Sequence, residues 1–186
     1  SKGIPLNKCG KLVVAKNQAD HAGLDELVRR GKANGIPLEA ISADEARAIE
    51  PRVKTCERAL FSPATSTVDP TLVMAAMKND ALDEGVKLHC GVRYLTSSKQ
   101  RVVTTAGTFE AGYVVNAAGL YADRIAREFG FSEHYRILPF KGLYLYSSEP
   151  AKSIRTNIYP VPDLKNPFLG VHFTVAANGK VKIGPT

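Results

Sequence analysis

The 186-residue sequence has few cysteines, no glycine-rich GxGxxG dinucleotide fingerprint and no long apolar run. Cys9, Cys56 and Cys90 are odd in number and far apart, and they form no Cys-x-x-Cys pair. This argues against a disulfide framework or a zinc site and favours reduced thiols in a cytoplasmic protein. No apolar run approaches the length of a membrane span, and the first residues carry no signal peptide.

Histidine is also scarce, and its spacing matches no set of metal ligands. The four histidines are His21, His89, His134 and His172. Metal sites gather such ligands at short, regular spacings, so we expect no metal site.

The formal net charge is +7, but the basic residues are scattered along the chain and accompany no nucleic-acid-binding motif. The tightest cluster is Arg29, Arg30 and Lys32. We therefore expect a solvated basic surface and no nucleic-acid partner. Electrostatic attraction of an anionic substrate is the alternative that remains.

Apolar spacing and capping signals predict the elements of the first half. Residues 9–15 are suited to a strand, and residues 18–34 repeat apolar positions at helical spacing. Ser42 and Glu45 form a capping box that begins a short helix. A further helix is predicted from Asp69-Pro70 to Glu84, with its methionines in the core.

The rest of the chain alternates between two patterns. Strands are predicted at 86–92, around Tyr94, at 102–105 and at Tyr113–Asn116, and a helix follows. Helix, strand, small meander, strand and helix is the order of an α/β nucleotide-binding unit. After Gly130 come short strands with proline turns, typical of an antiparallel sheet, at 137–146, 157–162, 168–175 and 180–184. The fold class expected is α+β.

Several segments resemble one enzyme family. These are NKCGKLVVA (7–15), GKANGIPLEAISADEARAIEP (31–51), NIYPVPDLKNPFLGVHFT (157–174) and GKVKIGP (179–185). They are similar to the FAD-dependent L-2-hydroxyglutarate oxidase/dehydrogenases of the D-amino-acid-oxidase-like superfamily. FSPATSTVDP (61–70) and VVNAAGLYAD (114–123) are shared more broadly within that superfamily.

The resemblance implies a domain organisation. The family begins with a strand–helix–strand unit that carries the glycine-rich fingerprint, and it ends with a flavin-binding segment. This sequence contains neither, and both of its ends look cut, so we expect the central part of a longer enzyme. Residues 1–60 and 131–186 would be two parts of an antiparallel substrate domain. Residues 61–130 would be the α/β centre of the FAD-binding domain.

The resemblance also implies a reaction. The whole enzyme would transfer a hydride from L-2-hydroxyglutarate to FAD, giving 2-oxoglutarate, and would pass the electrons to oxygen or a membrane quinone. It would be cytoplasmic, with a peripheral contact to the inner membrane if the acceptor is a quinone. The chain alone would be inactive, would hold FAD poorly and would tend to self-associate. One alternative is a superfamily member that acts on an amino acid, another amine or glycerol 3-phosphate. A more distant one is a non-catalytic basic binding module.

The motif that contains His172 implies a catalytic base, because a neutral imidazole can accept the hydroxyl proton of a 2-hydroxy acid. A histidine hydrogen-bonded within the core is the alternative. Lys141 would bind a substrate carboxylate, or it is an exposed turn lysine. Tyr144, Tyr159 and Thr174 are candidates for hydroxyl donors to the substrate, or they serve only in packing.

The segment Asn116, Ala117, Ala118 and Gly119 would pass close to the cofactor, because small residues permit close approach of a ligand to the backbone. Tight strand–helix packing needs the same small side chains. The backbone of Val92 would meet the adenine, or Val92 is a buried strand residue.

Overall fold

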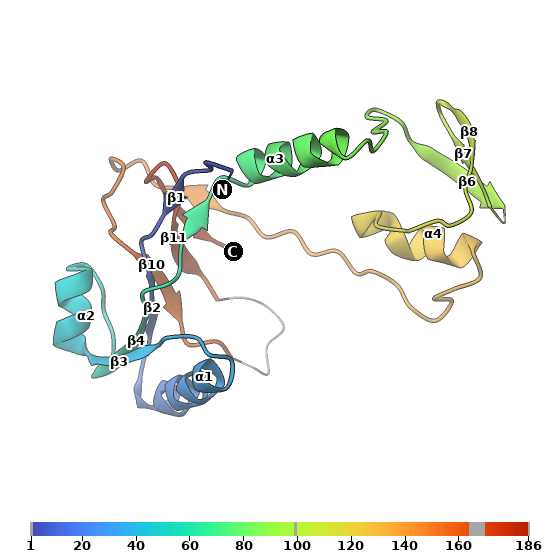
Figure 1. Cartoon of the computed structure of the whole chain (residues 1–186). Coiled ribbons are helices and arrows are strands. Elements are labelled where there is room, and N and C mark those ends of the chain that lie inside the picture. Colours follow the sequence, from blue (N-terminus) through green and yellow to red (C-terminus); the bar gives the residue numbers. More distant parts are fainter. Residues whose placement is uncertain (1, 99, 164–169, 186) are drawn as a thin grey trace. The chain divides into compact units, whose positions relative to one another are not determined.

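A computed structural model of the chain describes residues 2–98, 100–163 and 170–185. It separates into two compact units, one of Ser1–Asp80 with Gly142–Thr186 and one of Ala81–Lys141 (Figure 1). The boundaries expected at residues 60 and 130 refer to the domains of a whole enzyme and stay a prediction.

The first unit is built on a seven-stranded sheet. In spatial order its strands are β3 (Glu39–Ser42), β4 (Arg58–Ser62), β2 (Lys11–Val14), β10 (Asn157–Pro160), β11 (His172–Val175), β12 (Val181–Gly184) and β9 (Leu145–Tyr146). Among the described strands of this sheet, only β2 and β10 pair in parallel. A separate antiparallel pair joins β1 (Leu6–Asn7) to β5 (Thr67–Val68).

Two helices cover opposite faces of the sheet. Neighbouring residues of a strand point to opposite sides, so adjacent residues of β2 contact different helices. Leu12 packs with Ala46 of α2 (Ala43–Ile49), whereas Val13 packs with Leu24 of α1 (His21–Ala33), which follows the short helix η1 (Gln18–Asp20). The antiparallel sheet with its helices confirms the expected α+β class (Figure 1). Within the described residues, no helix is both long and apolar enough to span a membrane.

The capping signals read from the sequence are confirmed. The Ser42 hydroxyl accepts the Glu45 amide at 3.2 Å, and the Glu45 carboxylate accepts the Ser42 amide at 2.7 Å. Asp69 accepts the Thr71 amide at 2.8 Å and begins α3 (Pro70–Asp83).

The expectation that the methionines of α3 lie in the core is wrong. Met74 and Met77 are 63% and 60% exposed, and α3 contains no buried residue. The hydrogen bonds inside a helix satisfy its interior backbone groups, so α3 forms although Met74 and Met77 stay exposed.

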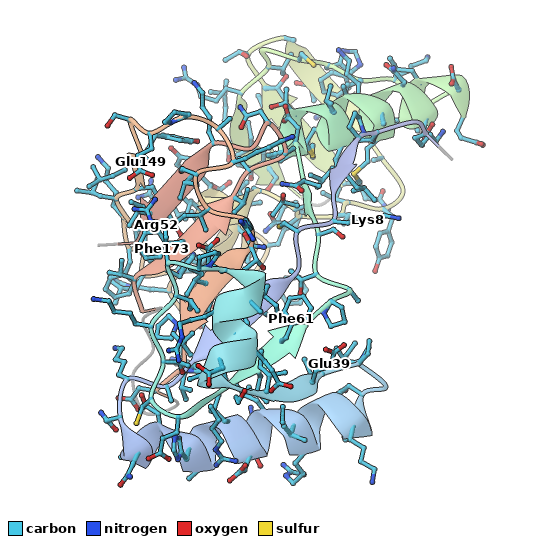
Figure 2. The ribbon with its side chains drawn as sticks, turned by 90° about the vertical axis from the view of Figure 1, so that its left-hand side faces the viewer. Lys8, Glu39, Arg52, Phe61, Glu149 and Phe173 are labelled. Atoms are coloured by element: carbon cyan, nitrogen blue, oxygen red, sulfur yellow. The ribbon has the colours of Figure 1, made fainter. Side chains whose placement is uncertain are left out.

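A buried carboxylate fixes the approach to β10. Glu50 is 1% exposed and accepts the backbone amides of Arg52 at 2.9 Å and Arg155 at 2.7 Å. The Arg52 guanidinium also makes two hydrogen bonds to Glu149, at 2.5 and 3.1 Å (Figure 2). These contacts join the end of α2 to the segment before β10.

The second unit consists of a three-stranded antiparallel meander and a short helical segment. Its elements are β6 (Tyr94–Ser98), β7 (Arg101–Thr104), β8 (Gly107–Glu110), η2 (Gly119–Tyr121) and α4 (Ala122–Glu128). Glu128 of α4 accepts a hydrogen bond from the Tyr94 hydroxyl at 2.6 Å. No residue described in this unit is fully buried.

Several predicted strands are absent or shorter in the structure. Residues 86–92 and Tyr113–Asn116 form no strand, and Tyr113 and Val115 are 87% and 80% exposed. A strand needs a neighbour to pair with its backbone groups, and no described segment pairs with these residues. In the later half, the strand predicted at 137–146 contains only β9, and that at 168–175 begins at His172. Residues 164–169, which fall within the motif at 157–174, lie outside the described residues.

Candidate active site

His172 and Tyr159 lie side by side on one face of the seven-stranded sheet. Ile158 of β10 pairs with Phe173 of β11 on the face that carries α2. The next residues in the antiparallel register therefore point to the other face. There the Tyr159 ring stacks on the imidazole, with centroids 4.0 Å apart and planes 16° apart.

Tyr144 approaches the same imidazole from the other side. His172 pairs with Gly184 of β12, and the Tyr144 ring meets the imidazole edge-on at 6.2 Å. A Cβ at Gly184 would lie 2.7 Å from the Tyr144 ring and 2.6 Å from the Leu143 carbonyl oxygen. Gly184 also has φ +147°, which side chains disfavour. Because Gly184 has no side chain, the Tyr144 ring can lie against it. The sequence analysis gave Gly184 no role.

The hydrogen bond of His172 fixes which ring nitrogen can act as a base. The residue is 5% exposed, and its Nδ1 lies 2.9 Å from the Gly170 carbonyl oxygen. A carbonyl oxygen only accepts, so Nδ1 carries the hydrogen, and Nε2 of the neutral ring keeps a lone pair. Nε2 forms no hydrogen bond with the described residues, so it is available to accept a proton.

Two hydroxyl groups lie next to the imidazole on the same face. The Tyr159 hydroxyl is 3.3 Å from the Thr174 hydroxyl. The buried Asn157 side chain holds their strands in place, because it accepts the Val175 amide at 2.8 Å and donates to the Gly10 carbonyl at 2.9 Å. The structure therefore brings together four residues singled out in the sequence: Tyr144, Tyr159, His172 and Thr174.

Two lysines that the sequence analysis did not single out flank this group. The Lys182 ammonium is 3.9 Å from the centroid of the Tyr144 ring, and the Lys11 ammonium is 5.6 Å from that of Tyr159. Both lysines belong to segments that carry the family resemblance, 7–15 and 179–185, but only the strand register brings them beside the aromatic rings. Lys141 is exposed at the end of the second unit, and its role stays a prediction.

The segment predicted to approach the cofactor forms an irregular bend in the second unit. The Asn116 side chain donates to the Ala122 carbonyl at 2.8 Å and accepts the Ala118 amide at 3.2 Å, which holds the bend closed. Gly119 has φ +55°, and no atom lies within 4 Å of the position that its Cβ would take. Ala117 adds another small side chain, so the backbone is open to a ligand.

The features around this bend fit a large anionic cofactor such as FAD. Ala118 lines a cavity of about 560 Å³ together with Arg93, Arg124 and Glu128. The two guanidinium groups suit an anionic group, while the Glu128 carboxylate accepts a hydrogen bond from the Tyr94 hydroxyl. The backbone of Val92 is in no strand and forms no hydrogen bond with the described residues. It could therefore bind a ligand, as the resemblance implies, and the cofactor roles of these residues stay predictions.

The described residues contain no group of three or more His, Cys, Asp and Glu side chains that could hold a metal ion. Cys9, Cys56 and Cys90 are all free thiols.

Comparison with known proteins gives a consistent assignment. The family described as FAD dependent oxidoreductase (DAO) matches residues 1–186. The mitochondrial L-2-hydroxyglutarate dehydrogenase of Caenorhabditis briggsae is 37% identical over an alignment of 194 positions, gaps included, which covers 98% of this chain and 44% of that protein. For the L-2-hydroxyglutarate dehydrogenase of Escherichia coli K12 the identity is 34%, over 98% of this chain and 44% of that protein.

Solved structures agree with this assignment. The crystal structure of glycine oxidase from Geobacillus kaustophilus superposes with a TM-score of 0.78 and 26% identity, over 98% of this chain and 48% of that one. This chain therefore spans less than half the length of these relatives. The chain belongs to the DAO family of FAD-dependent oxidoreductases.

Proposed function

We propose that the protein containing this chain oxidises a small 2-hydroxy acid, L-2-hydroxyglutarate, to 2-oxoglutarate with FAD. The observation that carries the proposal is the buried His172 imidazole, whose Nδ1 donates to Gly170 and whose Nε2 is left to accept a proton. The identity of 34–37% to L-2-hydroxyglutarate dehydrogenases supports the choice of substrate.

His172 acts as the base. Oxidation of a secondary alcohol to a ketone removes a hydride from the carbon and a proton from the hydroxyl group. FAD, when bound, supplies the two-electron acceptor for the hydride. Nε2 of the neutral imidazole takes the hydroxyl proton, and the Gly170 carbonyl oxygen stabilises the imidazolium that results through Nδ1.

The surrounding side chains orient the imidazole and the substrate. Tyr159 stacks on one side of the imidazole and Tyr144 meets it edge-on, so the ring has little freedom to turn. The hydroxyls of Tyr159 and Thr174 donate hydrogen bonds to the substrate carboxylate next to the reacting carbon. Lys141 supplies a further cation for a carboxylate when the whole enzyme is assembled.

The cofactor is held in part by the second unit. Asn116, Ala117, Ala118 and Gly119 would present an open backbone to FAD, and the free backbone groups of Val92 would hold its adenine.

The cellular setting follows from the same proposal. Three free thiols suit a reducing, cytoplasmic compartment. The electron acceptor of the whole enzyme would be oxygen or a quinone, and a quinone would require peripheral contact with the membrane.

Anaerobic reduction of the flavin tests the reaction. We expect L-2-hydroxyglutarate, but neither glycine nor glycerol 3-phosphate, to bleach the visible absorbance of the full-length holoenzyme. His172→Asn keeps a donor for the Gly170 carbonyl but removes the base, so it should slow bleaching roughly 10²- to 10⁴-fold and retain FAD. Bleaching of this variant at a rate close to that of the wild type would exclude His172 as the base. Faster bleaching by glycine would favour an amine oxidase.

A further inference from the structure

Lys182 lies on the substrate face of the sheet, one aromatic ring away from the proposed base. In the antiparallel pair of β11 and β12, Lys182 lies directly opposite Thr174, so both side chains emerge on the face that carries His172. The Lys182 ammonium is 3.9 Å from the centroid of the Tyr144 ring. The centroid of the His172 imidazole is 6.2 Å from the centroid of the same Tyr144 ring. A residue in this position is within reach of a small molecule bound at His172.

The charge of Lys182 is not neutralised by the described part of the chain. Its side chain is partly buried against an aromatic ring, yet it forms no ion pair with any described carboxylate. Many other basic side chains do have such a partner; they are Lys2, Arg29, Arg30, Arg47, Arg52, Arg58, Arg101 and Arg127. A cation that is partly desolvated and unpaired attracts an anionic ligand more strongly than a solvated one does.

A second ammonium increases the positive potential of the same face. Lys11 lies 5.6 Å from the centroid of Tyr159, on the far side of the imidazole from Tyr144, and has no described carboxylate partner. The neutral hydroxyls of Tyr159 and Thr174 lie between the two cations along the sheet. This face thus offers hydroxyl donors beside the imidazole and ammonium groups farther out.

We infer that Lys182 binds the second anionic group of the substrate and so selects a 2-hydroxydicarboxylic acid. The inference rests on the proposed function for the position of the reacting carbon at His172. A dicarboxylate has one carboxylate next to the reacting carbon, where the hydroxyls of Tyr159 and Thr174 donate to it. Its other carboxylate is separated by a short chain and reaches the ammonium of Lys182. A substrate with an uncharged end leaves this cation unpaired and binds more weakly.

The test compares two substrates in full-length holoenzyme variants. L-2-Hydroxyglutarate and L-2-hydroxyvalerate have the same chain length, but only the first has a second carboxylate. Lys182→Met should lower kcat/KM for L-2-hydroxyglutarate roughly 10- to 100-fold, mainly by raising KM. A loss of this size corresponds to the removal of one charge-assisted hydrogen bond. It should leave kcat/KM for L-2-hydroxyvalerate within about twofold, and Lys182→Arg should recover part of the loss.

Lys180→Met is the matched control, because it removes the same charge from the same hairpin at an exposed position. It should change neither value. An equal loss of kcat/KM for both substrates in Lys182→Met would overturn the inference and leave Lys182 as a packing partner of Tyr144. Unchanged kinetics in that variant would overturn it as well.

Binding of an unreactive dicarboxylate separates this inference from the proposed function. Calorimetric titration of the oxidised holoenzyme with glutarate should show about tenfold or weaker binding in Lys182→Met than in the wild type. If that difference is found but L-2-hydroxyglutarate does not reduce the flavin, the dicarboxylate site stands and the proposed reaction is wrong. If the flavin is reduced but glutarate binds both proteins equally, the reaction stands and the role of Lys182 is wrong.

Discussion

The Tyr159 ring lies nearly parallel to the His172 imidazole, with 4.0 Å between the centroids. This arrangement follows from the sheet register, since the two residues are neighbours across β10 and β11. The stack fixes the plane of the imidazole, and the hydrogen bond from Nδ1 to Gly170 fixes its rotation within that plane. The direction of Nε2 is therefore set by the fold and does not require a bound substrate.

Two substitutions at Tyr159 should separate the stack from the hydroxyl. Tyr159→Phe keeps the ring and loses the 3.3 Å contact with Thr174, so it should lower the free energy of unfolding by no more than about 1 kcal/mol. Tyr159→Leu loses the stack as well and should cost about 1–3 kcal/mol. Denaturant unfolding of the purified proteins measures both values. Equal costs would mean that the stack contributes nothing to stability.

Gly184→Ala should disturb Tyr144 without any change in charge. The new Cβ would lie 2.6 Å from the Leu143 carbonyl oxygen and 2.7 Å from the Tyr144 ring, at a φ of +147°. We expect the free energy of unfolding to fall by about 1–3 kcal/mol and flavin reduction in the holoenzyme to slow. Gly112→Ala is the control, because its Cβ would have no neighbour within 4 Å. A Gly184→Ala protein as stable as this control would contradict the packing described here.

The ion pair of Arg52 and Glu149 should make stability depend on pH on the acid side (Figure 2). The hydrogen bond from Arg52 lowers the pKa of the Glu149 carboxyl from its ordinary value of 4.5. Between the lowered pKa and 4.5 the unfolded chain binds more protons than the folded one. The stabilisation is therefore present above about pH 4.5 and is lost as the pH falls through the lowered pKa.

Glu149→Gln should accordingly lower the unfolding midpoint near neutral pH and make the acid-side decline shallower. Glu39→Gln serves for comparison, since Glu39 is exposed on β3 and forms no ion pair with the described residues (Figure 2). Unfolding midpoints measured from pH 3 to 7 check this. If the unfolding midpoint depended on pH in the same way in the two variants, the ion pair would contribute nothing to stability.

Local signals predicted the elements that satisfy their own backbone groups. The capping box at Ser42 and the Asp69-Pro70 helix start were both found where the sequence placed them. The strand expected at Tyr113–Asn116 was not found, because a strand depends on a neighbour that no local pattern specifies. The exposed Met77 shows the same limit, since helical spacing indicates an apolar face but not what covers it.

The candidate site was predictable only in part, although the resembling segments 157–174 and 179–185 contain most of its residues. His172, Tyr159 and Thr174 belong to a segment that resembles one family, and the structure groups them. Lys182 and Gly184 join the group through the pairing of β11 with β12, a relation that a single sequence does not report. Residues that act through strand register are therefore the ones that sequence reasoning missed.

Tyr94 should make the second unit sensitive to alkaline pH. Burial, and then the 2.6 Å hydrogen bond to Glu128, raise the pKa of the Tyr94 hydroxyl above its ordinary value of 10.0. Above pH 10.0 the unfolded chain loses this proton before the folded chain does. The stabilisation is thus complete below pH 10.0 and is lost as the pH rises through the raised pKa.

Tyr94→Phe removes both the proton and its hydrogen bond. Glu128 keeps its contacts with the Thr96 hydroxyl at 3.2 Å and the Ser97 amide at 3.3 Å, so α4 should remain attached to β6. In this variant we expect faster amide exchange in residues 122–128 at pH 8 than in the wild type. After correction for the intrinsic pH dependence of exchange, the exchange rate should then increase less from pH 8 to 11 than it does in the wild type. An identical pH dependence of the two proteins would mean that the Tyr94 proton does not stabilise the contact between α4 and β6.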